Sequence, residues 1–88
     1  MVIKFSDKWA PDPDTFGIVF EATADGLPIR CRVLTEALQD IDSPNALGTP
    51  ESQFTSNQSR FQEIAKLLIL AGRVKNGQVV IGSTDVRT

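Results

Sequence analysis

The feature that most constrains this chain is the dipeptide Asp25-Gly26, which separates two alternating apolar segments. Such a dipeptide is typical of a two-residue β-hairpin turn, because both of its residues adopt positive φ at low cost. Counting outward from the turn places Glu21 opposite Arg30, a pair of opposite charges. The apolar face of the hairpin then consists of facing pairs: Ala24 with Leu27, Ala22 with Ile29, Phe20 with Cys31, and Ile18 with Val33. The sequence therefore predicts a half-buried antiparallel hairpin over residues 16–34.

Two further strands are predicted at the ends of the chain. Residues 2–5 alternate between apolar and polar side chains and indicate a short first strand. The prolines and aspartates that follow predict a loop over residues 6–14, with Trp9 folded back onto the domain. Asn76-Gly77 predicts a turn before a closing strand over residues 78–82, which is apolar on both faces and so favours a covered or central position. The order of the terminal strands in the sheet stays open.

Two helices are expected between the hairpin and the last strand. Thr35 can cap a short helix over residues 36–41, and a loop follows over residues 42–50. Thr49-Pro50 resembles a helix start, but the polar segment 49–59 is compatible with a helix, a frayed helix start or a mobile lid. We expect the ordered helix to begin near Ser56 or Ser59 and to end at Gly72. Its apolar face contains Phe54, Phe61, Ile64, Ala65 and Leu68.

These elements predict one α+β domain over residues 1–88, a length that suits a single core. Its sheet would be small and antiparallel, built from the 16–34 hairpin and the N- and C-terminal strands. One short and one long helix would pack on one face of that sheet. The expected core consists of Phe5, Phe20, Phe61, Ile64 and Leu68.

Composition removes several classes of function. The chain has no histidine, which excludes the commonest general base and the commonest metal ligand. A net charge of −2 argues against nucleic acid as a partner. No apolar run approaches the roughly 18 residues of a membrane span, and we expect neither a membrane segment nor a secretory signal. A single cysteine favours a reducing cytoplasm.

Four groups of residues could carry chemistry or contacts. Cys31 points inward in the predicted register and is interpreted as a core thiol, so that no catalytic residue is assigned. Asp7, Asp12 and Asp14 lack the spacing of a calcium loop, and neither a metal nor another cofactor is expected. Arg30 and Arg32 could contact an anion. Leu67 and Leu70 lie away from the apolar face of the long helix and could form a protein interface.

The ordered set of these residues resembles a known family. The resemblance rests on Ile3 and Phe5, Asp7, Trp9, the hairpin residues Gly26, Ile29 and Cys31, the Thr35–Leu38 segment, Phe54 to Ala65, Gly72, and the closing Val79-Val80-Ile81 with Asp85. They are similar to the short bacterial proteins of domain-of-unknown-function family 1488. This chain departs from the pattern at Ala10, where an aspartate is expected, and in the polar run 55–59. The resemblance implies a bacterial, cytoplasmic α+β protein and supplies no activity.

The leading functional hypothesis is a non-catalytic protein-interaction or regulatory module, which binds an unknown protein or itself as a homodimer. The alternative is binding of a small anion or nucleic acid through Arg30, Arg32 and neighbouring cations.

The missing histidine leads to a first prediction. No unperturbed side chain titrates between about pH 6 and 7.5, so the melting temperature should stay flat over that interval. A series of thermal melts checks this. A steep transition in the interval would contradict the prediction and reveal a strongly shifted carboxylate or thiol.

Overall fold

The computed structural model describes residues 1–41 and 48–86, and the hairpin turn at Asp25-Gly26 organises its sheet. Strands β2 (Ile18–Ala24) and β3 (Leu27–Val33) are antiparallel, and every predicted facing pair of the register is present. Asp25 and Gly26 have φ of 50° and 84°, the positive values that this turn requires. The predicted hairpin is therefore confirmed, although Leu27 at its tip remains 70% exposed.

Strand β1 (Ile3–Pro11) pairs antiparallel with β2 and is much longer than predicted. Its register shifts at a bulge, because Phe5 faces Ala22 whereas Trp9 faces Phe20. The prediction of a loop over residues 6–14 is wrong up to Pro11, since an edge strand tolerates proline at its end. The bulge lets Trp9 turn toward the core, where the centroids of the Trp9 and Phe54 rings lie 5.5 Å apart. The predicted anchoring of Trp9 is confirmed.

Strand β4 (Gln78–Ile81) completes a sheet of order β1-β2-β3-β4 and runs parallel to β3. The Asn76-Gly77 turn precedes it, with φ of 54° and 73° as expected. The helices between β3 and β4 form the crossover that a parallel pair needs, so the sheet is mixed rather than wholly antiparallel. β4 is an edge strand, and the prediction of a central or covered strand is wrong. Val80 points away from the core and is 46% exposed.

The helices are α1 (Thr35–Ile41), α2 (Pro50–Ser56), α3 (Gln58–Leu70) and α4 (Ser83–Val86), the last of which was not predicted. The Thr35 hydroxyl donates a hydrogen bond to the Thr15 carbonyl oxygen instead of capping α1. Thr49 caps α2 through a hydrogen bond from the Ser52 N–H, so residues 50–56 form a helix of their own. The long helix α3 begins at Gln58, which confirms its predicted start near Ser56 or Ser59. Asn57 separates α2 from α3, and its side-chain amide donates a hydrogen bond to the Gln53 carbonyl oxygen. The predicted loop falls largely on residues 42–47, which lie outside the described residues.

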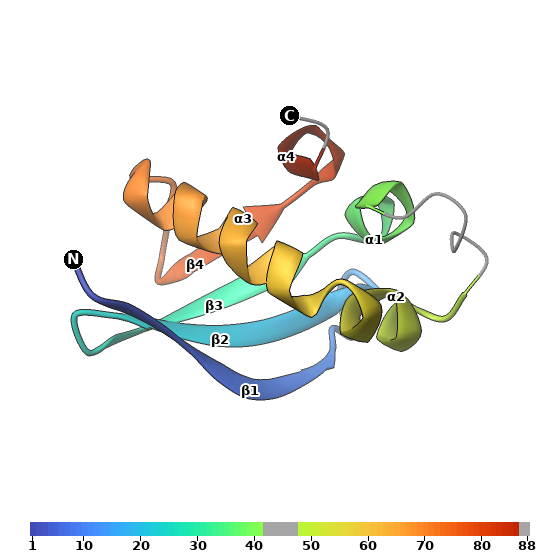
Figure 1. The fold of residues 1–88 in the computed structure, drawn as a ribbon, viewed down its shortest axis with the longest axis horizontal. Coiled ribbons are helices and arrows are strands. Elements are labelled where there is room, and N and C mark those ends of the chain that lie inside the picture. Colours follow the sequence, from blue (N-terminus) through green and yellow to red (C-terminus); the bar gives the residue numbers. More distant parts are fainter. Residues whose placement is uncertain (42–47, 87–88) are drawn as a thin grey trace.

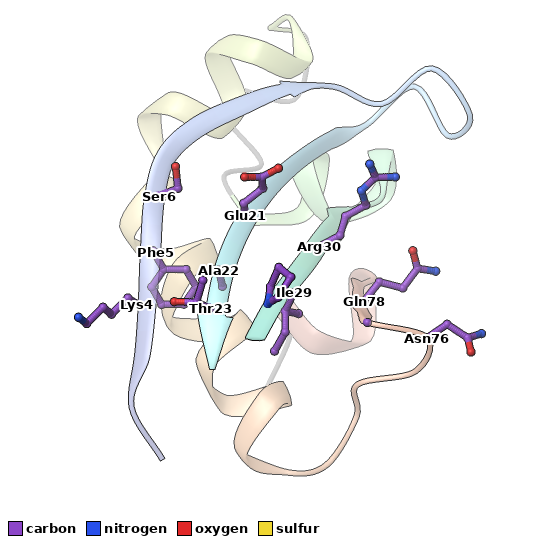
Figure 2. A pocket seen from close by; sticks show the side chains of 12 residues that line it. Lys4, Phe5, Ser6, Glu21, Ala22, Thr23, Ile29, Arg30, Asn76 and Gln78 are labelled. Atoms are coloured by element: carbon purple, nitrogen blue, oxygen red, sulfur yellow. The ribbon is translucent and has the colours of Figure 1, made fainter. Parts of the chain in front are cut away.

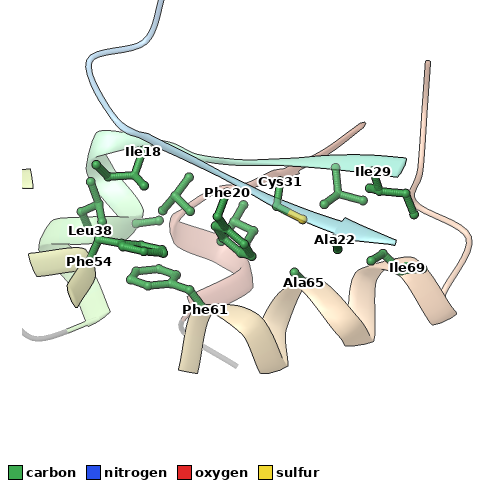
Figure 3. Close-up of a cluster of buried hydrophobic side chains, with 14 of the residues drawn as sticks. Ile18, Phe20, Ala22, Ile29, Cys31, Leu38, Phe54, Phe61, Ala65 and Ile69 are labelled. Atoms are coloured by element: carbon green, nitrogen blue, oxygen red, sulfur yellow. The ribbon is translucent and has the colours of Figure 1, made fainter. Parts of the chain in front are cut away.

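The hydrophobic core lies between the sheet and the helices (Figure 3). The buried face of α3 is centred on Phe61, Ala65 and Ile69, whereas Ile64 and Leu68 are only half-buried. The predicted face is therefore rotated toward one side of the true face. Phe20 and Phe61 are core residues as predicted, and Phe5 is half-buried. The largest fully buried side chains are Phe20, Phe54, Phe61, Ile18, Leu38, Ile81, Val33, Val79 and Cys31.

The described helices all gather on one face of the sheet, and none of them lies on the opposite face (Figure 1). This architecture confirms the predicted α+β class and the placement of helices on a single face. Among the described residues, no helix has both the length and the apolar character needed to cross a membrane.

Burial gives a second prediction. Replacing Phe61, which is fully buried, by alanine should lower the free energy of unfolding by about 3–5 kcal/mol, because it removes an aromatic ring and leaves a cavity. Urea denaturation measures the loss. Leu67→Ala, on the outer side of the same helix, is the matched control and should change stability by less than about 0.5 kcal/mol. Equal losses in the two variants would show that the assigned helix face is wrong.

Candidate functional site

The helix-free face of the sheet contains the first candidate site, which we call the upper hollow. It has a volume of about 590 Å³ and extends over β1, β2 and β3 to the turn before β4. Figure 2 shows Lys4 and Arg30 on opposite sides of this hollow. A second hollow of about 330 Å³ adjoins it and shares Glu21 and Arg30. The residues that line the upper hollow are Lys4, Phe5, Ser6, Glu21, Ala22, Thr23, Pro28, Ile29, Arg30, Asn76, Gly77 and Gln78.

The two arginines proposed as anion contacts differ in their surroundings. Arg30 is exposed and faces Glu21 across the hairpin as predicted, and it forms no ion pair within the described part of the chain. Arg32 is half-buried and already contacts carboxylates. Its Nε donates to Asp12 Oδ2 at 3.0 Å, and its Nη2 lies 3.4 Å from Asp14 Oδ2. The predicted anion contact therefore depends on Arg30, because the charge of Arg32 is already balanced.

The loop between β1 and β2 is organised around Asp12, whose side chain is 3% exposed. Its carboxylate accepts hydrogen bonds from Arg32, from the Thr15 hydroxyl (2.8 Å) and from the Asp14 N–H (3.0 Å). The Asp12 N–H donates to the Gly17 carbonyl, and the Asp12 carbonyl accepts from the Phe16 N–H, both at 2.9 Å. This single residue therefore ties together both ends of the loop and β3.

The same contacts set the ionisation of Asp12. Hydrogen bonds from Arg32 outweigh the effect of burial and lower the pKa of Asp12 from 3.8 to about 2. Asp12 is therefore ionised at neutral pH. The pairing in turn raises the pKa of Arg32 above its ordinary value.

Phe16 occupies an unusual conformation in this loop. Its φ is 62°, in the left-handed region, and its side chain remains 78% exposed. A bulky residue rarely adopts this region, which costs about 1–2 kcal/mol for a residue with a Cβ atom. The next residue must be glycine, because a Cβ at Gly17 would lie 1.9 Å from the Val33 carbonyl oxygen. The chain thus passes tightly against β3 and turns an aromatic ring toward solvent.

The other predicted site residues lie elsewhere. Cys31 is fully buried, and burial raises the pKa of its thiol to about 12, so the sulfur is protonated at neutral pH. Leu67 and Leu70 are exposed on α3, as the helix pattern indicated, at 58% and 54%. They lie on the helix side of the sheet, so the structure does not bring them together with Arg30.

The aspartates near Trp9 do not form a cluster of ligands. Asp12 is held by Arg32, whereas Asp7 and Asp14 are exposed. Within residues 1–41 and 48–86 there is no group of three carboxylate or thiol side chains that could hold a metal ion.

Comparison with known proteins identifies the family. A family model described as "Protein of unknown function (DUF1488)" matches residues 3–81 of the 88-residue chain. The chain belongs to the DUF1488 family. No curated protein and no solved structure matches it. The match covers the described strands β1 to β4 of this DUF1488 domain and ends just before α4.

Sequence reasoning missed Phe16 as a notable residue of this DUF1488 domain. The signal was available in the spacing of Asp12 and Gly17, which encloses a four-residue hairpin loop. Such a loop places its last residue in the left-handed region, where glycine or asparagine is usual. That reasoning requires β1 to extend as far as Pro11, and the two prolines argued against such an extension.

The Asp12 contacts give a third prediction. Because the pKa of Asp12 is lower in the folded state, its ionised form stabilises the fold above about pH 4, and this stabilisation is lost as pH falls toward about 2. Asp12→Asn should therefore lower the melting temperature at pH 7 and flatten its fall between pH 4 and 2. Thermal melts over this range measure both effects. Exposed Asp7 provides the control Asp7→Asn, and an Asp12→Asn curve parallel to that of wild type would contradict the prediction.

Proposed function

We propose that this DUF1488 domain is a non-catalytic protein-interaction module that uses Phe16 as its anchor. The observation that carries the proposal is the combination of a left-handed backbone, with φ of 62°, and a side chain that is 78% exposed. Backbone strain of this kind is concentrated at functional sites, where the surrounding structure maintains it.

The energetics of Phe16 argue against a role in stabilising the chain itself. Its backbone conformation costs about 1–2 kcal/mol, which glycine would avoid. Its ring recovers little of that cost within the chain, because most of its surface stays in water. An exposed ring on a strained backbone is, however, well suited to bury its surface in another molecule.

The rigidity of the loop favours binding. Asp12 holds the loop through Arg32, Thr15 and the backbone of Phe16 itself. Arg32 connects it to β3, and the Thr35 hydroxyl connects the Thr15 carbonyl to α1 at 3.1 Å. A side chain held in this way loses less conformational freedom on association. Aromatic residues in such positions often contribute most of the energy of an interface.

The chemistry around the ring indicates the kind of partner. The Asp14 side chain, two residues before Phe16, is 81% exposed, and its Oδ2 lies 3.4 Å from Arg32 Nη2. The partner would therefore be a protein that presents an apolar cavity with a basic residue at its rim. We place this interaction in a bacterial cytoplasm, which agrees with the family resemblance and with a single, buried cysteine.

Replacing Phe16 with glycine should separate stability from binding. Phe16→Gly relieves the strained backbone, so the free energy of unfolding should stay level or rise despite the loss of an aromatic residue. Urea denaturation measures it. Under this proposal the same variant weakens partner binding about 30-fold or more, the loss typical of an interface anchor.

The partner can be identified by photo-crosslinking in cells, with the crosslinking residue placed at position 16 and, in a parallel culture, at position 27. Leu27 is the matched control because it is also apolar and 70% exposed but sits in a different turn. The proposal expects a protein captured at 16 and absent at 27, whose purified form binds Phe16→Gly more weakly than Leu27→Gly. Identical capture at both positions, or equal affinity for the two variants, would overturn it.

A further inference from the structure

We propose that the upper hollow is a binding site for a small anionic molecule, one that carries a phosphate or carboxylate on an apolar ring. This inference goes beyond the interaction at Phe16 and concerns a different part of the domain. A volume of about 590 Å³ lies within the range of about 300–1,000 Å³ that small-molecule sites occupy.

The hollow has both a structural origin and an apolar lining. It lies on the face of the sheet opposite the described helices (Figure 1), and the bulge in β1 after Phe5 interrupts the strand beside it. Pro28 supplies apolar lining, whereas Phe5, Ala22 and Ile29 border the hollow through their backbone, because their side chains face the core. A flat apolar group could therefore rest against the strands while its charged group remained at the rim.

The polar groups around this lining are mostly hydrogen-bond donors. Lys4 on β1 and Arg30 on β3 stand on opposite sides, as Figure 2 shows, and Glu21 is the one acidic residue among the described residues that line the hollow. The Thr23 hydroxyl lies between them. Two cations against one acid make the hollow locally positive in a chain whose net charge is −2. An anion is therefore the ligand that this arrangement favours.

One side of the rim is held in place by backbone hydrogen bonds. The Arg30 N–H donates to the Gly77 carbonyl at 2.9 Å and fixes the Asn76-Gly77 turn against β3. The Lys75 N–H donates to the Gln78 carbonyl, also at 2.9 Å, and closes the turn. The amides of Asn76 and Gln78 are thereby held on the same side as Arg30 (Figure 2). Arg30 comes from the hairpin and both amides from the Asn76–Gln78 segment, so two distant segments of the chain place donor groups on this side.

The availability of Arg30 supports the assignment. Arg32 is held by Asp12 and Asp14, whereas neither Arg30 nor Lys4 forms an ion pair within residues 1–41 and 48–86. An incoming anion would therefore not have to displace a carboxylate from either cation. Binding should weaken as ionic strength rises, because both cations are exposed to solvent.

The test is a titration of the full 88-residue chain with phenyl phosphate and, separately, with benzoate, followed by amide NMR shifts. Phenol and inorganic phosphate are the controls that carry only one half of the ligand. We expect saturable shifts at Thr23, Arg30, Gly77 and Gln78 with at least one of the two complete probes, and weaker binding of both controls. Whether phenyl phosphate or benzoate binds more tightly identifies the anionic group.

Variants make the assignment specific. Arg30→Gln and Lys4→Gln should each weaken binding about tenfold, the loss expected for a charge-assisted hydrogen bond. Arg73→Gln is the matched control, because Arg73 is an exposed cation outside the upper hollow. Thermal melts confirm that each variant is folded. No saturable shift with either complete probe, or equal weakening by Arg73→Gln, would overturn the inference. Either result would leave the proposal for Phe16 intact, since capture at position 16 does not involve the upper hollow.

Discussion

The pairing of β2 with β3 is the constraint on which the rest of the structure depends. Its register assigns alternate residues of both strands to opposite faces, so Cys31 and Phe20 enter the core whereas Arg30 and Glu21 point away from it. A shift by one residue would reverse this assignment and expose the whole apolar set. The candidate ligand contact at Arg30 and the inert thiol at Cys31 are thus two consequences of a single turn at Asp25-Gly26.

The Asp12–Arg32 pair connects that sheet to the loop before β2. A half-buried arginine that holds a buried carboxylate does more than add a surface ion pair, because it orients the loop that carries Phe16. Because of this pair, the two arginines of β3 have different roles. Arg32 maintains local structure, while Arg30 remains available to solvent. A count of charges alone would treat the two as equivalent.

Much of this fold could be predicted from sequence where local chemistry decides the outcome. The Asp25-Gly26 turn, the Thr49 cap and the end of α3 shortly before Gly72 each follow from one or two residues. Tertiary contacts decided what was missed. The pairing of β1 with β2 continues past the bulge to Pro11, and packing beneath the sheet favours Ile69 over Leu68 at the end of α3. For the candidate sites, Arg30 follows from alternation along β3, whereas the exposure of Phe16 depends on the loop that Asp12 closes.

The parallel pairing of β4 has a consequence for how the chain assembles. Within the hairpin, facing residues such as Ala24 and Leu27 are close in sequence, whereas Arg30 and its partner Gln78 lie 48 positions apart. Closing so long a segment loses more chain entropy before any contact compensates for it. We therefore expect the β1–β3 meander to form early from local contacts and β4 to dock after the helices are in place. Until then the outer edge of β3 is open to other strands, so the period before β4 docks is when a newly made chain is most exposed to misassembly.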